Sequence, residues 1–160
     1  MTAIVILSFL TWAVAVGCAV LSLAGNPVYR LYRRTPDPIL RAAVVTLEQD
    51  SFDEADDDVT SFIQLVSRWL LTLLALFLAE LAICVYFVSQ RPTFWLCWFV
   101  LAKDVIAVAA SFLLVHKRRW PNPIAALREL PPWVMRWERV NYFLSAVCFV
   151  VLFLVVNEIL

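Results

Sequence analysis

The sequence predicts an all-α polytopic membrane protein with four transmembrane helices and short interfacial helices in two cytoplasmic loops. Hydrophobic residues make up 63% of the 160 residues and charged residues only 16%, whereas soluble domains are about 45–50% apolar and about 25% charged. The apolar residues also fall in four runs, each close to the roughly 20 residues that a helix needs to cross a bilayer. We therefore expect a single membrane domain over residues 1–160.

The first apolar run covers residues 3–24 and ends before Gly25. It is too long for the apolar part of a signal peptide and has no basic residue before it, so we expect a retained span. The second run covers residues 66–88. Its helix is predicted to start earlier, because Ser61 and Gln64 have the spacing of a capping box.

The third and fourth runs cover residues 94–115 and residues 133–156. Because only residues 89–93 separate the second run from the third, these two spans are predicted to form an antiparallel hairpin. The longer connections, residues 25–60 and residues 116–132, hold most of the basic residues. The positive-inside rule then predicts that both connections are cytoplasmic and both termini lie outside, in a bacterial-type inner membrane.

One sequence pattern occurs in both long connections. Residues 33–39 read RRTPDPI and residues 118–124 read RRWPNPI, with five identical positions. Each copy follows a span that runs toward the cytoplasm, so residues 1–90 and residues 91–160 are a possible parallel repeat.

Each copy of this pattern joins an arginine pair to a predicted helix start. We expect the first proline to end the transmembrane helix, and the following Asp-Pro or Asn-Pro to begin a short helix on the inner leaflet. The arginines are either interfacial anchors or binding sites for anionic lipid headgroups: Arg33, Arg34, Arg118 and Arg119.

Three charged residues lie inside predicted spans, and they are the strongest functional signal in the sequence. Glu80 precedes Arg91 by 11 positions and Lys103 follows it by 12, so hairpin packing places the two at one depth near the membrane midplane. An isolated charge there costs about 2.5–3.5 kcal/mol, and we therefore predict a Glu80–Lys103 ion pair. Asp104 is expected to share Lys103, to bond to the fourth span, or to be protonated.

Polar residues of the neighbouring helix faces are predicted to pack around this charge cluster. Ser111 lies on the same side of the third span as Lys103 and Asp104, whereas Asn141 and Ser145 share one face of the fourth span. The four helices are therefore expected either to enclose a polar centre or to present it to a partner subunit.

Features of catalytic and nucleic-acid-binding proteins are missing from the sequence. Acidic and basic residues number 13 each, so no net charge favours nucleic acid. The single histidine, His116, cannot form a bis-histidine haem site, and the four cysteines lie in apolar runs without C-x-x-C spacing. We expect no enzymatic activity, no cofactor and no metal site.

The leading hypothesis is a non-catalytic membrane subunit that assembles, through the midplane cluster, with other membrane proteins or with itself. One alternative is a membrane-permeabilising oligomer of the holin or toxic-effector kind. Another is a transporter subunit or a subunit with a proton or ion pathway. Membrane lipids, with anionic headgroups at the cytoplasmic face, are expected partners under each hypothesis.

Overall fold

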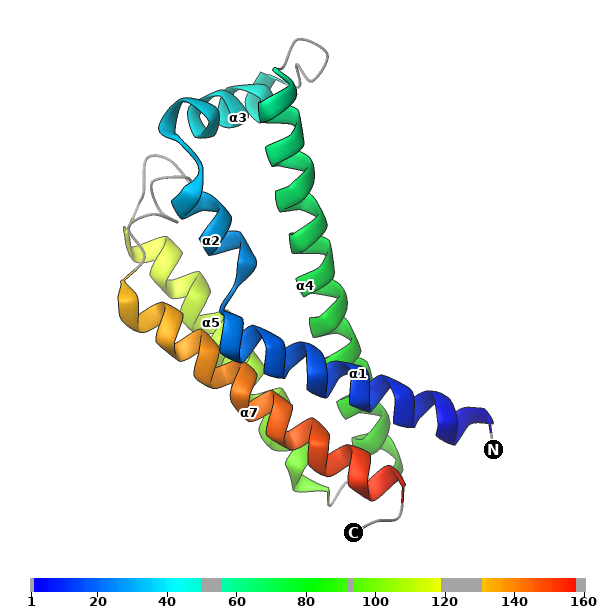
Figure 1. The fold of residues 1–160 in the computed structure, drawn as a ribbon. Helices are drawn as coiled ribbons and strands as arrows, with labels where there is room; N and C mark the ends of the chain where they lie inside the picture. The colour runs from blue at the N-terminus through cyan, green and yellow to red at the C-terminus, as the bar shows by residue number, and fades with distance from the viewer. Residues whose placement is uncertain (1, 50–55, 92–93, 119–130, 158–160) are drawn as a thin grey trace.

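The computed structural model describes residues 2–49, 56–91, 94–118 and 131–157, and over these residues it contains helices and no strand (Figure 1). This confirms the all-α class for the described part of the chain. The described helices are α1 (Thr2–Ala24), α2 (Pro27–Arg34), α3 (Asp37–Gln49), α4 (Asp57–Gln90), α5 (Trp95–Arg118) and α7 (Pro132–Val156).

Three segments among the described residues are long and apolar enough to cross a membrane. They are Ile4–Arg34, which combines α1 and α2, together with α4 and α7. These segments agree with a membrane protein. The third predicted run forms the helix α5, but α5 is not among the three candidates and has Lys103 and Asp104 near its middle. Length and composition therefore establish three candidate spans and not four.

Helices α1 and α7 pack side by side in opposite directions, and a polar contact joins them near each end (Figure 1). At one end the Asn26 side chain donates to Glu138 Oε1 at 2.7 Å. At the other end the Asn157 side chain donates to Ser8 Oγ at 2.9 Å. This pairing brings the first and last spans together, so the hairpin of α4 and α5 packs against a second antiparallel pair.

The main hydrophobic core lies where α1, α4, α5 and α7 meet. Each of these helices contributes one buried cysteine to it: Cys18, Cys84, Cys97 and Cys148. Phe149 of α7 is fully buried in the same core. The cysteines are free thiols, so they act as small apolar packing residues where the helices approach closely.

Helix α4 is longer than a membrane span requires. Its 34 residues extend about 51 Å at 1.5 Å per residue, against a hydrocarbon core of about 30 Å. The helix begins at Asp57 and not at the expected capping box, because Asp57 and Asp58 form its first turn, where the helix dipole favours negative charge. Ser61 therefore lies inside the helix.

The part of α4 that exceeds the span length packs against α3. Leu40 and Ala43 of α3 are buried against Val59, Phe62 and Val66 of α4. We expected the apolar face of this short helix to lie on the inner leaflet. The structure instead buries these side chains against α4, which supplies the apolar surface that the sequence pattern requires.

The loop after α1 also differs in detail from the prediction. Helix α1 ends at Ala24, and α2 is a separate helix whose N-cap Asn26 accepts a hydrogen bond from the Val28 amide at 2.9 Å. The helix that ends before Pro36 is therefore α2 and not the transmembrane helix. Residues 119–130, with the second copy of the repeated pattern, lie outside the described residues, so the repeat stays a prediction.

Candidate functional site: a buried charge cluster beside a cavity

The three charged residues of the predicted spans form one buried cluster. Lys103 Nζ lies 3.2 Å from Glu80 Oε1 and 2.5 Å from Asp104 Oδ1, and exposure is 4% for Glu80, 9% for Lys103 and 4% for Asp104. The Ser145 hydroxyl donates a hydrogen bond to the same Glu80 oxygen. The predicted ion pair is thus present and joins α4 to α5, and the Ser145 hydrogen bond adds α7 to the cluster.

Helix geometry explains why these side chains meet. The short connection between α4 and α5 sets the two helices antiparallel, so residues at similar distances from the turn lie at similar depths. Glu80 falls on the side of α4 that also buries Ile83 and Cys84. Ser145 falls on the side of α7 that buries Cys148 and Phe149, because residues three and four positions apart share a helix face.

The cluster contains two carboxyl groups and one ammonium group, and its hydrogen bonding is incomplete. Glu80 accepts from both Lys103 and Ser145, whereas Asp104 accepts from Lys103 through Oδ1. Asp104 Oδ2 is buried and has no hydrogen-bond partner among the described residues. A buried carboxyl oxygen without a donor is costly, so Asp104 is the least satisfied member of the cluster.

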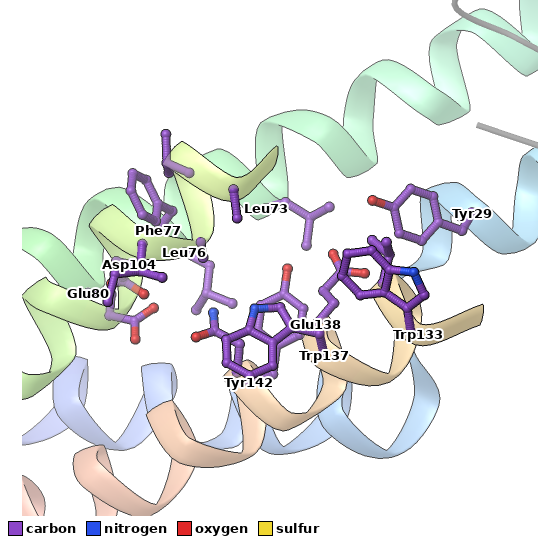
Figure 2. Close-up of a pocket in the computed structure, with 16 residues that line it drawn as sticks. Tyr29, Leu73, Leu76, Phe77, Glu80, Asp104, Trp133, Trp137, Glu138 and Tyr142 are labelled. Carbon is purple, nitrogen blue, oxygen red and sulfur yellow. The ribbon is translucent and has the colours of Figure 1, made fainter. Parts of the chain in front are cut away.

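A cavity of about 730 Å³ lies beside the cluster, between α4, α5 and α7. Glu80 and Asp104 line one end of it, and Tyr29 of α2 and Trp133 of α7 line the other end (Figure 2). Apolar side chains of α4 and α5 form much of the wall between these ends. The cavity therefore connects the buried carboxyl groups with the region where α2 meets α7.

The residues at the far end of the cavity were not predicted as site residues. Glu138, Trp133, Trp137 and Tyr142 of α7 line it together with Tyr29 (Figure 2). Tryptophans near the end of a span are typical of the membrane interface, which gives no indication of a cavity. The i,i+4 spacing of Trp133 and Trp137, and of Glu138 and Tyr142, was the available signal.

The contact between α1, α2 and α7 closes this end of the site. Asn26 both caps α2 and donates to Glu138. Gly25 has φ +76°, a left-handed conformation that glycine adopts without a steric penalty. A Cβ at Gly25 would lie 3.0 Å from the Arg139 guanidinium, so the chain bends from α1 into α2 in close contact with α7.

The remaining predicted site residues differ in position. Asn141 lines the cavity, and Arg33 and Arg34 are exposed in the last turn of α2, away from the cluster. Ser111 and Arg118 lie in α5, but their side chains are outside the described part of the structure, as is the whole of Arg119. Within the described residues, no group of three or more His, Cys, Asp or Glu side chains is arranged to hold a metal ion.

No family model, curated protein or solved structure matches this chain. The functional argument therefore rests on the cluster, the cavity and the helices that form them.

Proposed function

We propose that the chain is a non-catalytic integral membrane subunit in which α1, α4, α5 and α7 all cross the membrane. The fourth span, α5, is supported by its packing in the same core as the three candidate spans. It is also supported by the Lys103–Glu80 contact, which offsets the cost of charges inside the bilayer. In this proposal the termini face outward, and the connections before α4 and α7 are cytoplasmic.

The buried cluster is the observation that supports an assembly role. A buried charge network is seldom the most stable solution, because apolar residues of similar volume often give equal or greater stability, but polar residues in an apolar core can specify one helix arrangement. We propose that Glu80, Lys103 and Asp104 fix the register of the helices. The outer helix faces then present one defined surface to other membrane helices or to further copies of this chain.

A variant without the three buried charges tests the assembly role separately from the stability of the fold. Lys103→Met alone leaves two buried carboxyl groups unpaired, which costs about 3–5 kcal/mol. The triple variant Glu80→Gln, Lys103→Met, Asp104→Asn removes the charges together, so it is expected to fold but to lose its partners. Assembly with other proteins is measured by co-purification in mild detergent, and self-association by co-purification of two differently tagged copies of the chain. Thr72→Val, on α4 like Glu80, is the control.

The proposal fails if the triple variant retains the same co-purifying proteins and the same self-association as the unmodified chain. Dye release from vesicles containing the purified chain would replace the subunit proposal with a membrane-permeabilising oligomer. Arg33 and Arg34 are proposed to contact anionic headgroups, since both are exposed at the end of α2.

A proton or ion pathway is the second candidate function, and the cavity favours it. The cavity supplies Asn141, Tyr142 and Glu138 as polar groups between the buried cluster and the far end of α7, where the sequence alone gave few relay residues. A pH-dependent flux into liposomes that is lost in Glu80→Gln and Asp104→Asn would support this function. Liposomes that show no flux with the unmodified chain would exclude it.

A further inference from the structure

The cavity beside the charge cluster has the size of a small-molecule site. Its volume of about 730 Å³ falls within the range of roughly 300–1,000 Å³ that is usual for such sites. The described lining runs from Tyr29 and Trp133 at one end to the carboxyl groups at the other (Figure 2), and the space opens at the surface where Ile106 and Trp133 are more than half exposed. The volume therefore suits a compact molecule.

The acidic lining of the cavity selects a positive charge. Glu80, Asp104 and Glu138 line it, and no Lys, Arg or His is among the described residues that do so. Lys103 already pairs with Glu80 and Asp104 Oδ1, and Glu138 accepts from Asn26. The cluster thus sets two carboxyl groups against one ammonium group, and both carboxyl residues line the cavity, so a ligand's cationic group is expected at this end, beside Asp104.

The rest of the lining selects an apolar, partly aromatic ligand. Leu73 and Ile106 contribute apolar wall, and Trp133, Trp137 and Tyr142 contribute aromatic surface. Aromatic faces attract organic cations within about 6 Å. An inorganic divalent cation fits poorly, because calcium takes roughly 6–8 oxygen ligands and these walls cannot replace its hydration shell.

We propose that this cavity binds an amphipathic organic monocation, with its charged group at Asp104 and its apolar body between α5 and α7. The proposal goes beyond the subunit function, because a single chain is sufficient for binding and no assembly is required. It also does not depend on transport, since a bound cation need not cross the membrane.

Two ions of nearly equal size and opposite charge test the proposal. The full chain, purified in mild detergent, is titrated with tetraphenylphosphonium and separately with tetraphenylborate. We expect saturable binding of the cation and none of the anion. Tetraphenylphosphonium has no hydrogen-bond donor, so Asp104→Asn removes only its Coulomb attraction to the carboxyl group, and cation binding is expected to weaken about tenfold.

Matched substitutions outside the cavity distinguish binding in the cavity from nonspecific binding elsewhere on the protein. Asp57→Asn removes an exposed carboxylate outside the cavity and is expected to leave binding unchanged. Trp137→Leu is expected to weaken binding about threefold by loss of aromatic contact with the apolar body of the ligand. Trp95→Leu, at an 80% exposed tryptophan that does not line the cavity, is the corresponding control.

Equal binding of both ions would overturn the proposal, because a lipid chain or any apolar molecule would then fill the cavity as well. Unchanged cation affinity in Asp104→Asn would overturn it too. If Asp104→Asn does not fold, Trp137→Leu decides the question against Trp95→Leu: a selective loss supports the site, and equal affinities refute it. Since these titrations use the isolated chain, they are independent of whether partners co-purify.

Discussion

Lys103 is the residue on which the buried charges depend. It lies within 3.2 Å of Glu80 and 2.5 Å of Asp104, and at this level of the bundle it is the only cation described in contact with either carboxyl group. The hydroxyl of Ser145 supplies a further donor to Glu80. Each donor reduces the cost of burying a carboxyl group, so the loss of either should destabilise the fold in proportion to the charge left unpartnered.

Ser145→Ala tests the smaller of these two contributions. Removing the hydroxyl takes one donor from a buried acidic group, and we expect the free energy of unfolding to fall by about 1.5–3 kcal/mol. Ser89→Ala is the control, because Ser89 is exposed and donates to its own helix at Tyr86, where a substitution changes stability by about 0.5 kcal/mol or less. Unfolding in detergent measures the stability of both variants. Equal losses in Ser145→Ala and Ser89→Ala would refute the hydrogen bond between Ser145 and Glu80.

Asn26→Asp tests the contact between α1, α2 and α7. Aspartate is as good an N-cap as asparagine, so local propensity predicts no change. The structure predicts a loss of about 1–3 kcal/mol, since the Asn26 amide nitrogen that donates to Glu138 at 2.7 Å becomes an acidic oxygen.

Adding Glu138→Gln to Asn26→Asp is expected to recover most of this stability, because the glutamine amide donates where the carboxylate repelled. The thermal midpoints of the two variants provide the measurement. Absence of any recovery in the double variant would contradict the contact between Asn26 and Glu138.

At the scale of helices, the close approach of α1 to α4 depends on Gly17. A Cβ at this position would lie 3.0 Å from Leu76 Cδ1, so a large side chain cannot fit unless the Leu76 side chain or α4 shifts. We expect Gly17→Leu to destabilise the fold by about 1–3 kcal/mol through overpacking. Val20→Leu, at a position 55% exposed on the same helix, adds apolar volume without this clash, and similar thermal midpoints for both variants would contradict the packing.

The long helices were predictable because run length alone determines them in an apolar chain. The start of α4 was not, since Asp57 and Asp58 fell in the predicted connection of residues 25–60, although the helix dipole accommodates them in a first turn. The pairing of α1 with α7 was also missed. Apolar helices in a membrane choose their neighbours by close packing and a few polar contacts, and Asn157 near Ser8 has no sequence signal that links the two.

The candidate site was likewise predictable from the sequence only in part. The meeting of Glu80 with Lys103 followed from the hairpin, because one short turn fixes their depth. The cavity lined by Glu138 and Trp137 depends on the gap left between three helices, and such a gap follows from side-chain packing across elements that lie far apart in the sequence.

For the whole molecule, the arrangement of the helices predicts on which side of the membrane each connection and each chain end lies. The two chain ends lie at one end of the bundle and α3 lies at the opposite end (Figure 1). With four spans, a reporter attached to the C-terminus and one inserted at residue 53 should report opposite sides of the membrane, the inserted one being cytoplasmic. Alkaline phosphatase and green fluorescent protein fusions measure this, and matching results at the two sites would exclude a four-span topology.

Helix α4 runs without interruption from its contact with α3 to the charge cluster. Val59, which packs on Leu40 of α3, and Glu80 are 21 residues apart, or about 32 Å along one continuous rod. A rotation of α4 about its axis turns Val59 and Glu80 together. In the proposed four-span arrangement, a partner that rotates α4 through its contact with α3 would therefore also reorient the Glu80 carboxyl group relative to Lys103.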